Sequence, residues 1–234
     1  MPDLRGRHLL LWSNLLGGEK DQLERRFSGA VLHRQVQYSA MKEAFLEPIL
    51  RRMRMKKVLP TIYQYPSCRL LDIGCGSEYR LLKTVEPFIG SGVGIDFKVR
   101  ETENTKIKTM RMRMTDSLPF ESETFDIVTM LAVLEHLADP LRMMSETERV
   151  LKRGGRVVLT VPSKIAKPVL EFLAYRLQII SEVEIKDHKQ YFNRENLSEL
   201  LSQSGMSIER HRYFQMGMNN YCVAMKTTPM DRKQ

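Results

Sequence analysis

The chain is poor in cysteine and has no long apolar run. Only three of its 234 residues are cysteine, at positions 68, 75 and 222, and no two of them form a Cys-x-x-Cys pair. This odd number without paired spacing predicts neither a disulfide framework nor a zinc cluster. The apolar patch over residues 8–16 is interrupted by two polar residues, is shorter than a membrane span, and lacks a convincing signal-peptide cleavage site. We therefore expect a cytosolic, cytoplasmic protein without a transmembrane segment.

Acidic residues are fewer than basic ones, 28 against 37, which gives a net charge of +9. Basic domains attract polyanions through counterion release. The densest basic cluster, residues 51–57, lies at the end of a helix predicted over residues 39–57, where cations favour the C-terminal helix dipole and solvate one face. The aromatic residues are dispersed, and no RNA-binding module is recognisable. We do not expect a nucleic-acid partner; an anionic partner is the alternative.

The most informative stretch covers residues 69–78, with the sequence RLLDIGCGSE. Leu70 to Ile73 form a short apolar run that predicts a buried strand. Gly74 and Gly76 follow it and allow the backbone to turn tightly enough to approach a ligand closely. The stretch therefore predicts a ligand at the end of the first strand.

A second predicted strand, residues 92–96, ends in Asp96 about twenty residues further along the chain. Acids at this spacing bind the ribose of nucleotides in βαβ units. The third glycine of a dinucleotide fingerprint would fall at Tyr79, and Asp72 would place a negative charge beside a pyrophosphate. The pattern therefore favours a cationic nucleoside without phosphate.

This acid-x-Gly-x-Gly turn resembles the first motif of the class I S-adenosylmethionine (SAM) dependent methyltransferases, in particular the small-molecule, type 11-like enzymes. Further segments match that family in the same order, namely residues 115–120, 125–130, 133–140 and 150–162. The resemblance covers about residues 68–162. It implies an α/β fold with one Rossmann-like, doubly wound, mostly parallel seven-stranded sheet whose last strand is antiparallel.

The resemblance also implies SAM as the cofactor and S-adenosylhomocysteine (SAH) as its product. The residues that it places at the cofactor are Asp72, Gly74, Cys75, Gly76, Asp96, Phe97, Thr115, Asp116, Ser117, Leu131 and His136. Asp96 would accept both ribose hydroxyls, and Asp116 the adenine amino group. Asp116 could instead cap the turn before Pro119.

His136 is the one histidine within a family motif, and two roles are open for it. It could act as the catalytic general base that takes a proton from an acceptor hydroxyl, or it could line the cofactor pocket. The pair Glu135-His136 is similar to part of the metal-binding Glu-x-x-Glu-His motif of some methyltransferases, but Ala132 replaces the first glutamate. We therefore predict no metal site.

The chain divides into a helical N-terminal arm, residues 1–58, and a methyltransferase domain, residues 59–228. After the fifth strand, residues 164–192 are predicted to form a lid on the acceptor side, with a helix over 165–181 whose apolar face could equally pack on the core. The candidates for acceptor contacts are Tyr38, His188, Tyr191 and Arg194, although Tyr191 could also be a core residue.

Between the second and third strands, residues 98–106 are polar and lack a helical apolar stripe, which predicts a stunted crossover helix. A third strand is expected over residues 107–114, with three methionines on its core face. Asp139-Pro140 predicts a helix start, and Gly154-Gly155 the end of that helix. A last helix over 194–204 and a closing strand pair over 206–214 and 220–226 complete the expected order.

These expectations converge on an enzyme that methylates a small-molecule acceptor; oxygen is the expected methylated atom, and nitrogen and carbon are the alternatives. The sequence has no Asn/Asp-Pro-Pro-Tyr/Phe motif and no Pro-Cys nucleophile pair, which disfavours base methylation. Two alternatives are an RNA or protein methyltransferase and a regulatory protein that binds SAM without turnover.

Overall fold

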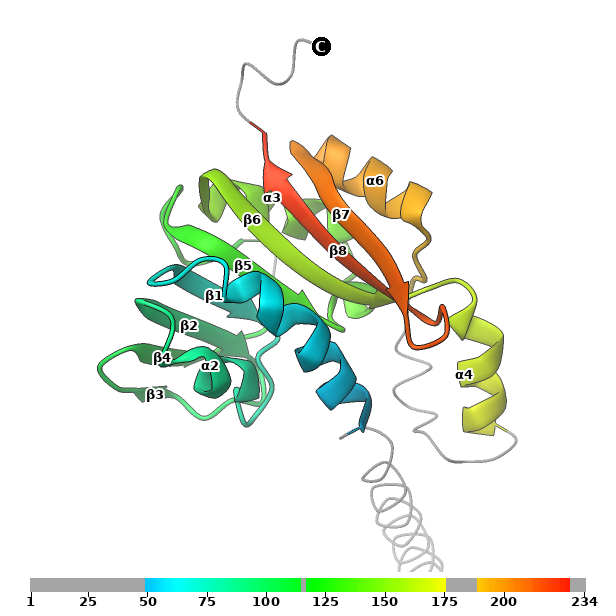
Figure 1. Ribbon diagram of the computed structural model, residues 1–234, viewed down its shortest axis with the longest axis horizontal. Helices are drawn as coiled ribbons and strands as arrows, with labels where there is room; N and C mark the ends of the chain where they lie inside the picture. Colours follow the sequence, from blue (N-terminus) through cyan, green and yellow to red (C-terminus); the bar gives the residue numbers. More distant parts are fainter. Residues whose placement is uncertain (1–48, 115–116, 176–188, 228–234) are drawn as a thin grey trace, which may run out of the picture.

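A single mixed sheet with helices on both of its faces forms the body of the protein (Figure 1). The computed structural model describes residues 49–114, 117–175 and 189–227. The sheet has eight strands in the order β3-β4-β2-β1-β5-β6-β8-β7. Their bounds are β1 Arg69–Ile73, β2 Ser91–Asp96, β3 Thr102–Glu103, β4 Ile107–Arg111, β5 Phe125–Leu131, β6 Leu151–Pro162, β7 Met206–Phe214 and β8 Asn219–Lys226.

The strand directions confirm the expected doubly wound topology. Strands β1, β2, β4, β5 and β6 pair in parallel with one another, whereas β8 is antiparallel to both β6 and β7. Along the chain, the strand order first runs outward from β1 through β2 to β4 and then returns to β5 on the other side of β1. In such sheets, ligands bind outside the carboxyl ends of the strands at this switch point.

The sheet has one short strand more than the seven that the sequence analysis expects. The polar segment after β2 forms no helix; β3 instead pairs antiparallel with β4, with Thr102 opposite Thr109. The turn between the two strands is fixed by Asn104, whose side-chain oxygen accepts hydrogen bonds from the backbone N–H groups of Lys106 and Ile107. Asn favours turns by bonding its own backbone in this way, so a polar stretch that cannot form an apolar helix face forms a hairpin here.

Helices cover both faces of the sheet. They include α2 Arg80–Val85, the 3-10 turn η1 Leu134–His136, α3 Pro140–Val150, α4 Ala166–Tyr175 and α6 Arg194–Gln203. One apolar cluster joins α3 and α6 to the sheet, and it includes Met143 and Leu197. A second cluster on the opposite face joins α2 to a further helix over residues 49–62, which lies across the front of the sheet in Figure 1.

The helix over 49–62 continues past the position at which the sequence predicts its end. It crosses the expected boundary between residues 58 and 59, and Val58 and Ile62 are both fully buried. The hydroxyl groups of Thr61 and Tyr221 form a buried hydrogen bond that ties its last turn to β8. These contacts stabilise the last turn even though Pro60 removes one backbone N–H.

Helix α3 begins where predicted and ends earlier. Asp139 caps it by accepting a hydrogen bond from the Arg142 N–H at 3.0 Å. The expected end at Gly154-Gly155 is wrong, because α3 stops at Val150 and both glycines lie within β6. Gly154 has φ +71° there, next to an irregularity in the register between β5 and β6, so the glycines shape the strand and not the helix end.

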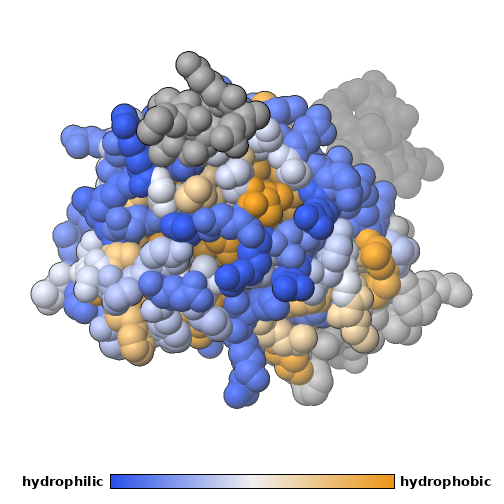
Figure 2. Space-filling view, turned by 45° about the horizontal axis from the view of Figure 1, so that its top comes forward, coloured by the Kyte–Doolittle hydropathy of each residue, from blue (hydrophilic) through white to orange (hydrophobic). Residues whose placement is uncertain are grey.

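Among the described helices, none is long and apolar enough to cross a membrane. Figure 2 shows that hydrophilic residues cover most of one face of the molecule, with hydrophobic patches between them.

Candidate cofactor and acceptor site

The glycine turn lies at the carboxyl ends of β1 and β2. The backbone N–H groups of Gly74 and Cys75 both donate to the Ile95 carbonyl, at 2.8 and 3.2 Å. Gly74 has φ +75°, and a Cβ on it would lie 2.3 Å from the Cγ2 atom of Val133. Only glycine therefore fits at position 74, and this contact brings the loop after β5 against the turn.

The second glycine of the turn faces open space. Gly76 has φ +70°, and a Cβ built on it would meet no atom within 4 Å. Its backbone N–H donates to the Oδ2 atom of Asp96 at 2.9 Å. The turn thus leaves a cradle over Gly76 beside a carboxylate, which a ligand can enter.

Asp96 is nearly buried and held from two sides. Besides Gly76, the Lys98 N–H donates to its Oδ1 atom at 2.7 Å, and the residue is 7% exposed. A carboxylate oxygen has two lone pairs, so each oxygen retains acceptor capacity for a ribose hydroxyl. Both oxygens of Asp96 can therefore accept a further hydrogen bond, and the bidentate ribose contact that the family resemblance implies stays a prediction.

Asp72 is the most strongly perturbed carboxyl at the turn. It is 3% exposed, and the Thr129 hydroxyl donates to its Oδ1 atom at 2.6 Å. Burial raises its pKa to about 7; the Thr129 hydrogen bond opposes this rise, and the charge of Asp96 adds to it. A cation bound here would favour the ionised form, which suits a sulfonium or ammonium group.

Cys75, between the two glycines, is half-buried, and its thiol has a raised pKa. Burial is the main cause, and the negative charges of Asp72 and Asp96 add to it. The thiol therefore stays protonated at neutral pH and is a poor nucleophile. Its Sγ atom donates to the Gly76 carbonyl at 3.6 Å, so its contacts here are structural.

The adenine side of the expected site is described in part, because Thr115 and Asp116 lie outside the described residues. Phe97 is 49% exposed directly after Asp96, and the Lys98 ammonium lies 5.0 Å from its ring centroid. Ser117 is exposed. A half-exposed ring beside Asp96 can stack on an adenine face, as expected from the sequence.

The loop that follows Ser117 is tied to α3 by two residues that the sequence analysis missed. Glu146 accepts a hydrogen bond from the Leu118 N–H at 2.8 Å, and Arg149 donates to the carbonyls of Leu118 and Phe120 at 3.0 and 2.7 Å. Glu146 and Arg149 also pair with each other at 2.8 Å. Their i, i+3 spacing on a predicted helix could have predicted the ion pair between them. It could not have predicted the loop that they bind.

Glu135 and His136 follow β5 at the same edge of the sheet. Leu131, at the end of β5, and His136, in η1, are both half-buried. Glu135 is 1% exposed, and its Oε2 atom has no hydrogen-bond partner among the described residues. Burial raises its pKa to about 7, against the opposing charge of Arg54. Buried polar atoms without partners are rare, which marks this carboxyl as a candidate for ligand contact.

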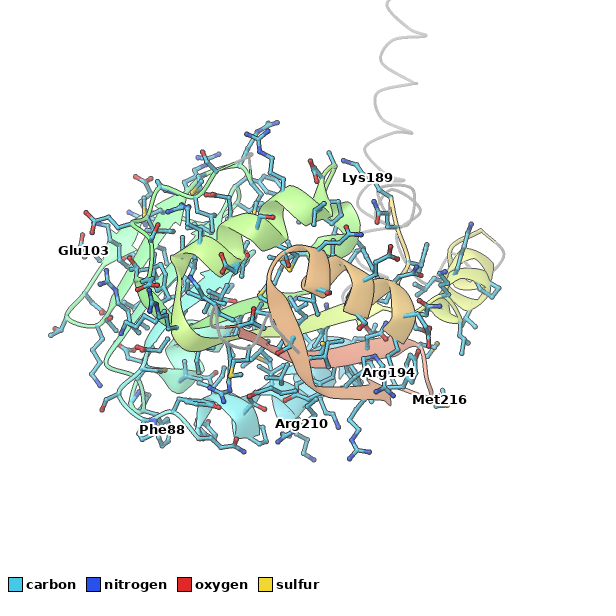
Figure 3. The ribbon with its side chains drawn as sticks, turned by 90° about the horizontal axis from the view of Figure 1, so that it is seen from above. Phe88, Glu103, Lys189, Arg194, Arg210 and Met216 are labelled. Carbon is cyan, nitrogen blue, oxygen red and sulfur yellow. The ribbon has the colours of Figure 1, made fainter. Side chains whose placement is uncertain are left out.

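The last residues of the expected lid return beside η1. The Lys189 N–H donates to the Glu135 carbonyl at 2.9 Å, and the Phe192 N–H donates to the Pro162 carbonyl at 3.2 Å. Tyr191 is half-buried between these two anchors, and Arg194 is exposed at the start of α6. Figure 3 shows Lys189 and Arg194 toward the end of the molecule where α4 lies.

The other acceptor-side candidates, Tyr38 and His188, lie outside the described residues. The same holds for the part of the expected lid over 176–188. The described part of the lid includes α4, of which Ala166 is buried and Val169 is 38% exposed. The lid and the acceptor contacts therefore stay predictions.

The described residues fit SAM, the cofactor that the glycine turn implies. The open cradle over Gly76, the oriented carboxylate of Asp96 and the ring of Phe97 suit a nucleoside. The buried carboxyl of Asp72 suits the cationic methionyl part. The contacts of each residue with the cofactor are expectations that binding experiments can check.

Comparisons with known proteins agree with this fit. A family model described as a methyltransferase domain matches residues 32–211. The demethylmenaquinone methyltransferase of Staphylococcus saprophyticus is 29% identical over 188 residues, which cover 70% of this chain and 80% of that protein.

Two solved structures share the fold at low identity. A SAM-dependent methyltransferase from Methanosarcina mazei is 22% identical with a TM-score of 0.54, covering 71% of this chain and 97% of that one. A SAM-dependent methyltransferase from Mesorhizobium loti is 17% identical with a TM-score of 0.55, covering 68% and 91%. Because the family model spans most of the chain and the site fits the cofactor, the chain belongs to the class I SAM-dependent methyltransferases.

Proposed function

We propose that this methyltransferase acts on a small molecule and transfers the methyl group to a hydroxyl oxygen. The observation that carries the proposal is the buried carboxyl of Glu135, whose Oε2 atom has no hydrogen-bond partner among the described residues. A hydroxyl of a bound acceptor would supply the missing donor. The named activity of the Staphylococcus relatives supports a small-molecule acceptor.

Bound SAM supplies a methyl group that is already activated by its sulfonium. The chain must therefore orient the acceptor and receive its proton. Transfer to a hydroxyl oxygen would release the hydroxyl proton, which a residue of the chain would have to receive. Alignment of this kind can contribute on the order of 7 to 11 kcal/mol to lowering the barrier.

Two neighbouring side chains are suited to receive that proton. Glu135 has a pKa raised to about 7 by burial, so it can hold a proton near neutral pH. His136 is half-buried in the same turn, and its imidazole is the other candidate base. The Lys189 N–H hydrogen bond to the Glu135 carbonyl holds this turn in place.

The test is methyl transfer from isotopically labelled SAM to a panel of phenols, enols, amines and activated carbon acids, with RNA and denatured protein as further arms. We expect a labelled small-molecule product whose methyl is released as methyl iodide by hydriodic acid, as an ether requires. A labelled RNA or protein, or a small product that retains its methyl under this treatment, would contradict the proposal.

The Glu135→Gln and His136→Ala variants separate the two bases. Loss of the base should reduce kcat by about 100-fold or more while SAM affinity is kept. A pocket-lining residue should instead weaken SAM binding. If both variants keep the kcat and the SAM affinity of the unaltered chain, this turn takes no part in the chemistry.

A second candidate acceptor is demethylmenaquinone. The favouring observation is the 29% identity to enzymes that carry this name, over 80% of the first relative's length. Reduced demethylmenaquinone belongs in the same panel, and turnover of it above all other acceptors of the panel would favour this candidate.

A further inference from the structure

The helix over residues 49–62 carries basic residues and contains no acidic residue. Its charged side chains are Arg51, Arg52, Arg54, Lys56 and Lys57. Two of them act on groups of the protein itself: the charge of Arg54 acts on Glu135, and the Lys57 ammonium lies 5.5 Å from the Tyr221 ring centroid. Arg52 and Lys56 are exposed and form no ion pair with any residue that the structure describes.

Apolar side chains share the outer side of this helix with these cations. Ile49 is 48% exposed and Met53 is 42% exposed. Together with Arg52 and Lys56, they occupy positions i, i+3, i+4 and i+7, which lie on one side of a helix. The outer side is therefore a mixed apolar and basic stripe, while Val58 and Ile62 face the core.

The tip of the β7–β8 hairpin adjoins the start of this helix. The Gln215 side-chain amide donates to the Leu50 carbonyl at 3.3 Å. Met216, the next residue, is 92% exposed, which is extreme for an apolar side chain. On its other side, the tip is tied to the end of β6, because the Ser163 hydroxyl donates to the Gly217 carbonyl at 2.6 Å.

The start of α4 follows directly after Ser163 and repeats the mixed character of the stripe. Ile165 is 63% exposed and Val169 is 38% exposed. Lys164 and Lys167 are exposed beside them, and neither forms an ion pair within the described part of the chain. Figure 3 shows Met216 toward the same end of the molecule as α4, away from Phe88 and Glu103.

Some cations on other parts of the surface have acidic partners, whereas others, such as Arg210 and Arg212, form no ion pair within the described part of the chain. Lys108 pairs with Glu103 at 3.0 Å on β4 and β3, and Arg153 pairs with Glu123 at 3.3 Å beside β6. The four cations of the stripe and α4 have no such partner among the described residues. This part of the surface therefore combines uncompensated positive charge with exposed aliphatic and methionine side chains.

We propose that the outer side of helix 49–62, the tip of the β7–β8 hairpin and the start of α4 form a docking face for an anionic lipid bilayer. Lysine and arginine attract anionic headgroups, and apolar side chains between them enter the boundary of the acyl region. An RNA would use the cations but would leave Ile49, Met53 and Met216 in contact with water, so the apolar residues favour lipid. The proposal is independent of which acceptor the enzyme methylates.

Flotation of the full chain with vesicles tests the proposal. We expect at least tenfold more binding to vesicles of phosphatidylcholine with 30% phosphatidylglycerol than to pure phosphatidylcholine at about 0.1 M salt. The Arg52→Gln/Lys56→Gln variant should lose about five-fold in affinity per cation, about 25-fold in total. The Ile49→Ser/Met53→Ser and Met216→Ser variants should each weaken binding by about tenfold with the charge unchanged.

Matched controls remove similar groups elsewhere. The Lys108→Gln/Arg153→Gln variant loses the same charge, and Leu141→Ser removes an apolar side chain that is 38% exposed on α3, on the opposite face of the sheet. Both controls should bind vesicles within about two-fold of the unaltered chain. Calorimetric SAH binding by every variant shows that the fold is kept.

Three results would overturn the proposal. The first is equal or absent binding of the unaltered chain to both kinds of vesicle. The second is an equal loss of binding in the control and the docking-face variants. The third is tighter binding to single-stranded RNA than to anionic vesicles, reduced by the charge variant and untouched by the apolar variants, which would assign the face to nucleic acid.

Discussion

Replacing Asp72 with asparagine should make the protein without cofactor more stable and the cofactor complex weaker. Asp72 is 3% exposed, and burial raises the pKa of its carboxyl from 3.8 to about 7. Above that pH, the folded state holds a desolvated charge that accepts a hydrogen bond from the Thr129 hydroxyl at 2.6 Å. Asparagine keeps an oxygen that can accept from Thr129 and removes the charge.

The magnitude follows from linkage. A carboxyl with a raised pKa binds more protons in the folded than in the unfolded state, so stability is lost as pH rises from about 4 to about 7. The interval between 3.8 and about 7, at 1.36 kcal/mol per pH unit, corresponds to about 4 kcal/mol, of which about 3 kcal/mol falls between pH 5 and 8. The new amide N–H groups could cost roughly 1 to 3 kcal/mol if unpaired, but this cost is the same at both pH values.

The assay is urea unfolding of both proteins at pH 5 and pH 8 without SAM. The free energy of unfolding of Asp72→Asn, relative to the unaltered chain, should rise by about 3 kcal/mol from pH 5 to pH 8. Glu135, whose pKa is also raised to about 7, titrates in both proteins and cancels in the comparison. If both proteins respond to pH in the same way, Asp72 is ionised in the folded state throughout, and the argument from burial fails.

Three further predictions concern the same turn. Asp96→Ala should weaken SAM binding by roughly 1.5 to 3 kcal/mol in calorimetry, because charged hydrogen bonds to the ribose are lost; unchanged affinity would refute the ribose role. Gly74→Ala should lower the free energy of unfolding by more than 2 kcal/mol, about the scale of backbone strain plus overpacking, since its Cβ would lie 2.3 Å from Val133. Gly76→Ala, with φ +70° but no neighbour within 4 Å, should cost about 1 kcal/mol of stability and reduce SAM affinity instead; similar stability losses in both variants would show that the cradle is not open.

Much of the sheet is predictable because each central strand is a short apolar run with an identifiable end. Strand β1 and strand β5 lie within one residue of their expected bounds. Strand β3 could not be predicted, because a two-residue exposed strand has no periodicity and depends on pairing with β4. The extra turn of the helix over 49–62 was also hidden, because Pro60 signals an end while burial of Val58 and Ile62 stabilises the continuation.

Contacts at the site were predictable where they join residues close together in the sequence. They were not predictable where they depend on which residues of two paired strands lie opposite each other. Asp96 stands at the end of a strand two residues before Lys98, whose N–H orients it, so its place follows from the sequence. Thr129 bonds Asp72 because β1 and β5 pair in parallel with these two residues opposite each other. The unpartnered oxygen of Glu135 likewise depends on burial that no spacing reveals.

Asp72 and Glu135 are buried carboxyl groups whose desolvation cost a ligand can partly offset. Each carboxyl is buried at the carboxyl end of one of two neighbouring strands, and burial raises the pKa of each to about 7. A desolvated carboxylate destabilises the folded chain without ligands, and a cation or a hydroxyl donor placed beside it recovers part of that cost. Because the recovered energy would appear on binding, the same burial that lowers stability above pH 7 would increase the selectivity of the site for a cationic cofactor and, under the proposed function, for a proton-donating acceptor.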